Sequence, residues 1–111
     1  MPRPPAPREL KLDEAARLLR IGWTDGHASA YPLRYLRGFC PCADCQGHAP
    51  GPKVFIPTEK PRLTDVRLVG RYALTPVWDD GHVTGIYSFE YLRELCPCPA
   101  CRPGGIAPEH R

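Results

Sequence analysis

The sequence has no apolar stretch that approaches the roughly 20 residues needed for a membrane-spanning helix. Its first eight residues, Met-Pro-Arg-Pro-Pro-Ala-Pro-Arg, lack the apolar segment of a secretory signal peptide. A strong charge imbalance is also lacking, because the formal net charge is only +3 over 111 residues. We therefore expect a cytoplasmic protein without a membrane partner.

The weak positive charge also argues against a nucleic-acid partner. If all six cysteines bound two divalent ions as thiolates, the net charge would fall to about +1, which removes the electrostatic support for such binding. We expect the partner to be another protein.

The composition predicts a small globular protein built from short elements. The chain contains 15 Pro and 10 Gly, with 42% hydrophobic and 24% charged residues. So many turn formers disfavour a helical bundle, and the length suits one domain with a modest core. We expect that domain at 9–104, with flexible tails at 1–8 and 105–111.

One pattern occurs twice in the chain. Trp, Asp-Gly-His, Tyr, Tyr-Leu-Arg and Cys-x-Cys-x-x-Cys follow one another in 23–45 and again in 78–101. Twelve positions are identical when a one-residue gap is allowed between the His and the first Tyr. All six cysteines lie in the two endings. We therefore predict two half-repeats, at about 9–46 and 64–102.

Each half is predicted to contain antiparallel strands, a hairpin, a short helix and a cysteine loop, which together make an α+β fold. Apolar residues alternate as in a strand where the domain begins, and Ser88 is a suitable N-cap for the second helix. The segment 13–19 fits either a helical turn or a hairpin connection. The predicted elements are strands around 10–12, 20–23, 27–31, 66–69, 72–78 and 83–87, and helices at 32–39 and 89–95.

The Asp-Gly pairs at 25–26 and 80–81 indicate β-hairpin turns. Asp and Gly tolerate the positive φ of a two-residue type I′ turn. With such a turn, His27 would begin the returning strand across from Thr24, and His82 would occupy the same place in the second half.

The cysteine loops indicate metal binding. Each Cys-x-Cys-x-x-Cys loop brings three thiols together, and structural zinc sites complete their tetrahedron with Cys or His. Each half supplies one histidine at a matching position, so two Cys₃His sites can be formed. Disulfides fit Cys-x-Cys spacing poorly and are rare in the cytosol. Reactive or redox thiols are the remaining alternative.

The spacing does not decide which histidine completes which loop. In a cis arrangement, His27 serves the loop of its own half. In a crossed arrangement, His82 serves the first loop and His27 the second. His48, three residues after Cys45, is a further candidate for the first loop.

The motifs resemble the small N-terminal domain of gamma-butyrobetaine hydroxylase-like proteins. The resemblance rests on Trp-x-Asp-Gly-His, on Leu-Arg before Cys-x-Cys-Ala-x-Cys, and on Val-Gly-Arg-Tyr-Ala-Leu followed by Trp-Asp-Asp-Gly-His-x-x-Gly-Ile-Tyr. It covers about residues 8–95. In the hydroxylase this domain holds zinc through the three cysteines and one later histidine.

Carried over by motif, the resemblance implies a first zinc site of Cys40, Cys42, Cys45 and His82, which favours the crossed arrangement. The internal repeat then assigns the second site to the remaining four residues. That second site is a departure from the hydroxylase pattern and rests on the repeat alone. Its ligands would be Cys96, Cys98, Cys101 and His27.

The resemblance does not bring the hydroxylase activity with it. The chain is too short for an added double-stranded β-helix, and it lacks a His-x-Asp…His iron triad. We therefore expect a non-catalytic zinc-binding module that acts as a protein-interaction or adaptor domain. Because the domain also occurs fused to P-loop ATPases of iron–sulfur assembly, the alternative is an iron–sulfur cluster binding or assembly factor. An enzyme with a labile zinc or a reactive thiol is the third hypothesis.

Overall fold

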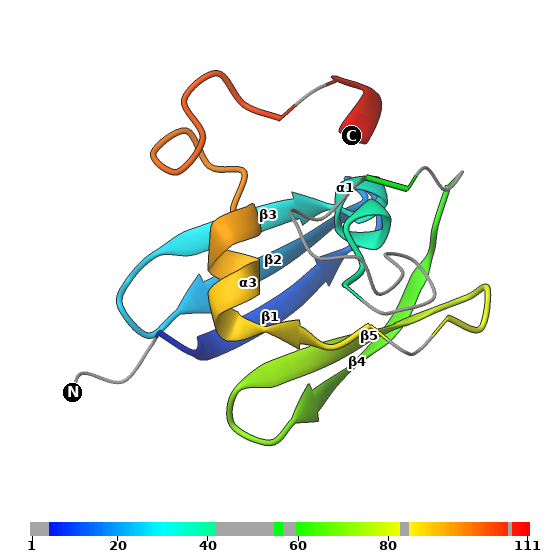
Figure 1. The fold of residues 1–111 in the computed structure, drawn as a ribbon, viewed down its shortest axis with the longest axis horizontal. Helices are drawn as coiled ribbons and strands as arrows, with labels where there is room; N and C mark the ends of the chain where they lie inside the picture. The colour runs from blue at the N-terminus through cyan, green and yellow to red at the C-terminus, as the bar shows by residue number, and fades with distance from the viewer. Residues whose placement is uncertain (1–4, 42–54, 57–59, 83–84, 107) are drawn as a thin grey trace.

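The computed structural model describes residues 5–41, 55–56, 60–82, 85–106 and 108–111. Within them it has two three-stranded antiparallel sheets, ordered β1-β2-β3 and β4-β5-β6, each followed by a short helix (Figure 1). The predicted α+β class is confirmed. The elements are β1 Pro7–Asp13, β2 Leu18–Trp23, β3 Ala28–Pro32, α1 Leu33–Gly38, β4 Leu63–Val69, β5 Ala73–Trp78, β6 Tyr87–Ser88, α3 Phe89–Leu95 and the 3-10 helix η1 Pro108–His110.

The two halves share one plan. The first half, β1 to α1, has the same order of described elements as the second half, β4 to α3. The first two strands of each half pair with a register shift near the start, between Pro7 and Glu9 in one half and between Leu63 and Asp65 in the other. The sequence repeat is therefore a repeat of structure.

The undecided segment after β1 is a hairpin connection. The Asp13 carboxylate accepts the backbone N–H of Ala16 at 3.0 Å, and Arg17 adopts a positive φ of 55°. Local side-chain hydrogen bonds of this kind favour a turn over a helix. The connection lets β1 and β2 pair directly.

The helices begin close to the predicted positions. Ser88 caps α3 as predicted, because its hydroxyl accepts the backbone N–H of Tyr91 at 3.0 Å. Pro32 ends β3 and occupies the N-cap position of α1, with φ −56° and ψ 136°. The extended ψ of Pro32 keeps it outside the helix, so α1 begins one residue later than the predicted 32–39.

Strand β6 is shorter than its counterpart β3. Within the described residues it pairs with Ala73 and Leu74, whereas β3 pairs along five residues of β2. Residues 83–84 of the predicted strand at 83–87 lie outside the described residues. Pro76 occupies the β5 position that Ile21 holds in β2. Because proline has no N–H to donate, it cannot extend this ladder as Ile21 does.

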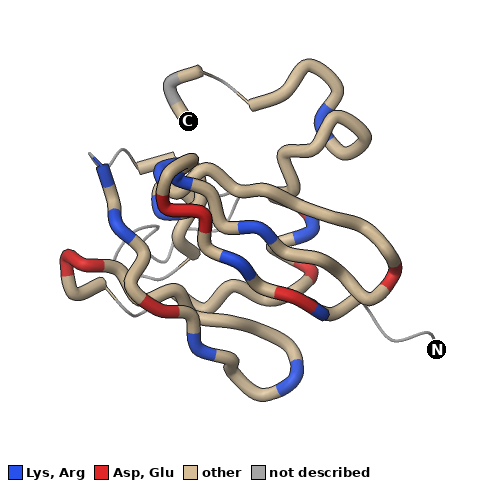
Figure 2. The backbone as a smooth tube through the Cα atoms, turned by 180° about the vertical axis from the view of Figure 1, so that it is seen from behind, with Lys and Arg blue, Asp and Glu red and all other residues tan. Residues whose placement is uncertain are grey.

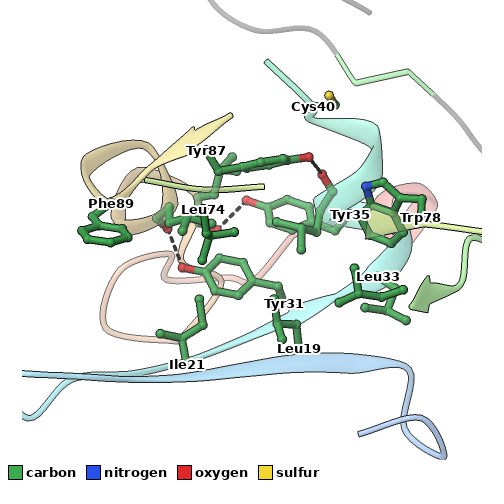
Figure 3. Packing of buried hydrophobic residues seen from close by; sticks show 14 of the residues in the cluster. Leu19, Ile21, Tyr31, Leu33, Tyr35, Cys40, Leu74, Trp78, Tyr87 and Phe89 are labelled. Atoms are coloured by element: carbon green, nitrogen blue, oxygen red, sulfur yellow. Dashed lines mark hydrogen bonds between the residues drawn. The ribbon is translucent and has the colours of Figure 1, made fainter. Parts of the chain in front are cut away.

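The core joins the two halves. Two buried tyrosines, Tyr31 and Tyr87, make hydrogen bonds between the halves (Figure 3). Tyr31 donates to the carbonyl of Leu92 at 2.6 Å, and Tyr87 donates to the carbonyl of Leu36 at 2.5 Å. Each tyrosine thus binds the helix of the opposite half.

A second pair of tyrosines repeats this crossing. Tyr35 donates to the carbonyl of Leu95 at 2.7 Å, and Tyr91 donates to the carbonyl of Phe39 at 2.5 Å. These carbonyls lie at the ends of the helices, directly before the cysteine loops. The core therefore fixes where each loop starts.

The segment expected as a C-terminal tail packs onto the domain in part. Ile106 is buried and belongs to the core cluster. The His110 ring stacks on Phe55 with 4.1 Å between centroids. Among the described helices, none has the length and apolar character required to span a membrane.

Candidate metal centre

Both hairpins carry their histidine on a three-residue turn, so the predicted two-residue turn is wrong. Gly26 N–H donates to Trp23 O at 3.1 Å, and Trp23 N–H donates to His27 O at 2.8 Å. Gly26 has a φ of +87°, whereas Asp25 does not have a positive φ. This is a turn closed by a glycine bulge. His27 therefore lies across from Trp23, and not from Thr24.

The second hairpin has the same geometry. Gly81 N–H donates to Trp78 O at 3.1 Å, Trp78 N–H donates to His82 O at 3.3 Å, and Gly81 has a φ of +82°. In both turns the aspartate accepts the backbone N–H of the histidine, at 3.1 Å for Asp25 and 2.9 Å for Asp80. The repeat thus presents two imidazoles in the same way.

His27 lies at the cysteine loop of the opposite half. Its Nε2 is 3.1 Å from Cys96 Sγ and 3.5 Å from the sulfurs of Cys98 and Cys101. All four potential ligand atoms lie within 4.8 Å of one another. Residues more than 65 positions apart in sequence are thereby brought into one cluster.

The cluster fits a single tetrahedral ion. Zn–S bonds of about 2.3 Å and Zn–N bonds of about 2.0 Å imply ligand–ligand distances of roughly 3.5 to 3.8 Å. The three nitrogen–sulfur distances are near this range, and the sulfurs are close enough to share one centre. The donor set, three sulfurs and one imidazole, is one of those that structural zinc sites use.

The cluster spans the boundary between core and surface. Cys96 is buried, Cys98 is half-buried and Cys101 is exposed. The backbone N–H of Cys101 lowers the pKa of the Cys98 thiol, whereas the hydrogen bond to Cys98 raises the pKa of Cys101 to about 11. Cys98 is thus the more acidic thiol of the two, and a divalent ion would favour the thiolate form of both because the thiolate is the ligand.

Two buried side chains form a chain of hydrogen bonds that ends at Cys96 Sγ. The indole N–H of Trp23 donates to Ser29 Oγ at 2.9 Å, and the Ser29 hydroxyl donates to Cys96 Sγ at 3.0 Å. A hydrogen bond from outside the ligand set orients a ligand and tunes its charge. Sequence reasoning missed Ser29, because it is not one of the twelve repeated positions.

The first cysteine loop approaches the second histidine. Cys40 Sγ lies 3.1 Å from His82 Nε2, and Cys40 is fully buried. Gly85 leaves room for this sulfur, since a Cβ at that position would lie 2.6 Å from Cys40 Sγ. Cys42, Cys45 and the competing His48 lie outside the described residues, so their part of the predicted site stays a prediction.

In both described contacts the histidine meets the loop of the opposite half. This is the crossed arrangement that the family resemblance favoured. The assignment of these residues as metal ligands stays a prediction.

Sequence reasoning also missed the role of two arginines. Arg93 donates to Asp25 at 2.9 Å, and Arg37 donates to Asp80 at 3.3 Å. Arg93 is the main cause that lowers the pKa of Asp25. Burial opposes ionisation of Asp80, but His82 N–H and Arg37 still hold its pKa below the ordinary value. The aspartate and the arginine both belong to the repeated pattern, and this repetition was the available signal that they interact.

The fold is similar to that of several solved proteins. A crystal structure of a protein of unknown function from the DUF971 family of Acidithiobacillus ferrooxidans is 35% identical, with a TM-score of 0.65, and the match covers 80% of this chain and 90% of that one. Two proteins solved by NMR in solution are 33% and 31% identical, with TM-scores of 0.71 and 0.64. They match 84% and 82% of this chain over 70% and 72% of their own.

The family model described as gamma-butyrobetaine hydroxylase-like, N-terminal, matches residues 10–93. The chain belongs to this family, and the resemblance drawn from its motifs is confirmed.

Proposed function

We propose that the chain is a non-catalytic module that binds two zinc ions in crossed Cys₃His sites. The first site is formed by Cys40, Cys42, Cys45 and His82, and the second by Cys96, Cys98, Cys101 and His27. The observation that carries the proposal is the convergence of His27 on three sulfurs of the opposite half, with all four ligand atoms within 4.8 Å.

The compactness of the second site favours one ion over an iron–sulfur cluster. The thiolates of a cluster bind different iron atoms and so must lie farther apart than the ligands of one ion. Sulfurs this close to one imidazole instead suit a single tetrahedral centre, and three sulfurs with one nitrogen is a common zinc set.

Closed coordination supports a structural role. A catalytic zinc keeps one position for water or substrate, whereas a structural zinc is held by four protein ligands. Four ligands per ion would use every cysteine of the chain. Each ion would then join one half to the other, and structural zinc contributes about 10 kcal/mol or more to folding in peptide systems.

We further propose that the module acts by contacting another protein in a reducing compartment such as the cytoplasm. Three large apolar side chains of the second half are exposed, namely Leu68, Tyr72 and Ile86, at 66%, 60% and 52%. Basic and acidic positions are interspersed along the described chain (Figure 2), an arrangement that suits a protein partner better than a nucleic acid.

Metal analysis of anaerobically purified protein, with an absorption spectrum, tests the metal proposal. We expect two zinc ions per chain and no visible absorption. Replacing His27 or His82 by Ala should weaken or release one ion, whereas His110→Ala is the matched control and should retain both. A brown protein with iron and sulfide would contradict the zinc proposal in favour of a cluster, and unchanged zinc in the His27→Ala variant would contradict the ligand assignment.

A further inference from the structure

Each hairpin that carries a site histidine is held by an arginine of the opposite half. On the first hairpin, Asp25 uses both carboxylate oxygens: Oδ2 accepts Arg93 Nη1 at 2.9 Å, and Oδ1 accepts the backbone N–H of His27 at 3.1 Å. One carboxylate therefore connects α3 of the second half to the backbone of His27.

The second hairpin repeats the connection through the same two carboxylate oxygens. Asp80 Oδ2 accepts Arg37 Nη2 at 3.3 Å, and Asp80 Oδ1 accepts the backbone N–H of His82 at 2.9 Å. The same bridge occurs in two halves that differ at most positions. Two independent occurrences argue against an incidental surface contact.

The arginines lie where they can act on the proposed sites. Each stands three residues before the first cysteine of its loop, Arg37 before Cys40 and Arg93 before Cys96. Arg93 also lies over the Trp23 ring, 5.2 Å from its centroid, which limits its freedom. The helix that starts a cysteine loop is thus tied to the hairpin that completes its site.

We propose that Arg93 and Arg37 are positioning residues that set the two site histidines through Asp25 and Asp80. This inference rests on the proposed function. The ion pairs are partly exposed, and such pairs contribute little to global stability. Their effect is local: they hold the imidazole at the loop before the ion binds, so less ordering accompanies binding.

The test measures zinc affinity separately at the two sites. Competition with a chromophoric chelator gives the dissociation constants, and cadmium NMR assigns each loss to a site. We expect Arg93→Gln to weaken the His27 site about tenfold, as loss of an outer-shell partner does, and to leave the His82 site unchanged. Arg37→Gln should show the reverse pattern.

Two further variants separate positioning from general destabilisation. Asp25→Asn should match Arg93→Gln, and the double variant should lose no more than either single one, because both act through one bridge. Arg67→Gln removes the same charge from an exposed position of β4, opposite Thr75 of β5, and should leave both affinities unchanged.

Unchanged affinity at the His27 site in Arg93→Gln, or an equal loss at both sites, would overturn the inference. If Arg93→Gln does not fold, Asp25→Asn decides: a weaker His27 site supports positioning, and an unchanged one contradicts it. Wild-type protein that binds no metal would refute the proposed function together with this inference. Wild-type protein with two ions and insensitive arginine variants would refute the inference alone.

Discussion

At the residue scale, four tyrosine hydroxyls join the two halves. Each donates to a backbone carbonyl on or just after the opposite helix. Tyr31 and Tyr87 are fully buried, so loss of either hydroxyl would leave a buried carbonyl without this donor. Such a group costs free energy because water cannot replace the lost partner.

We predict that Tyr31→Phe lowers the free energy of unfolding by about 2 kcal/mol, since the buried carbonyl of Leu92 loses its donor. Urea unfolding of the metal-loaded protein measures the change. Tyr72→Phe is the matched control, because Tyr72 is 60% exposed and should be neutral. Equal stability of Tyr31→Phe and wild type would show that the hydroxyl contributes nothing.

The stability effect of Tyr31→Phe also depends on pH. Burial raises the pKa of Tyr31 above its ordinary value of 10.0, so the folded state favours the protonated phenol. Its contribution is therefore complete below pH 10 and declines as the pH rises above that value toward the folded pKa. The stability difference between wild type and Tyr31→Phe should shrink above pH 10.

At the element scale, the sequence predicts where the hairpin turns lie but not how long they are. Asp-Gly identified both turns correctly, but the pair is compatible with two-residue and three-residue loops. The returning strand settles the length: His27 O accepts Trp23 N–H, which places Asp25 and Gly26 inside a longer loop. By contrast, local chemistry sufficed for α3, because Ser88 caps it without help from distant residues.

We predict that Gly26→Ala destabilises the protein by about 1 to 2 kcal/mol, the usual cost of a left-handed residue with a Cβ. Nothing lies within 4 Å of the added Cβ, so the cost would arise from the backbone alone. Gly81→Ala should behave alike. Thermal unfolding measures both variants.

Gly22→Ala is the control for this prediction. Gly22 lies in β2 without a positive φ, and the Cβ of alanine would meet Glu9 at an ordinary 3.7 Å. This variant should be close to neutral. A Gly26→Ala variant as stable as Gly22→Ala would contradict the role assigned to the turn.

At the scale of the whole molecule, the links between halves are crossed. Tyrosines bind opposite helices, arginines bind opposite hairpins, and His27 and His82 each meet the opposite loop. The sequence could predict the repeat and the ligand types, because both are local patterns. It could not by itself choose between cis and crossed pairing, since that choice depends on how α3 lies against the first sheet (Figure 1).

This crossing predicts that neither half unfolds alone. In zinc-loaded protein, urea should melt both halves in one transition, and a chelator should shift that transition to lower urea without splitting it. The reason is that each proposed metal site would join a loop of one half to a hairpin of the other. Loss of either ion would therefore weaken both sheets.

Trp23 and Trp78 allow each half to be followed separately, because one buried tryptophan lies in each. Fluorescence of Trp23→Phe reports the second half, and that of Trp78→Phe the first. In each variant, the fluorescence midpoint should coincide with the far-UV circular dichroism midpoint of the same protein, with and without chelator. A fluorescence change that precedes the loss of secondary structure would mean that one half opens independently, and the crossed links would then be too weak to make the domain a single cooperative unit.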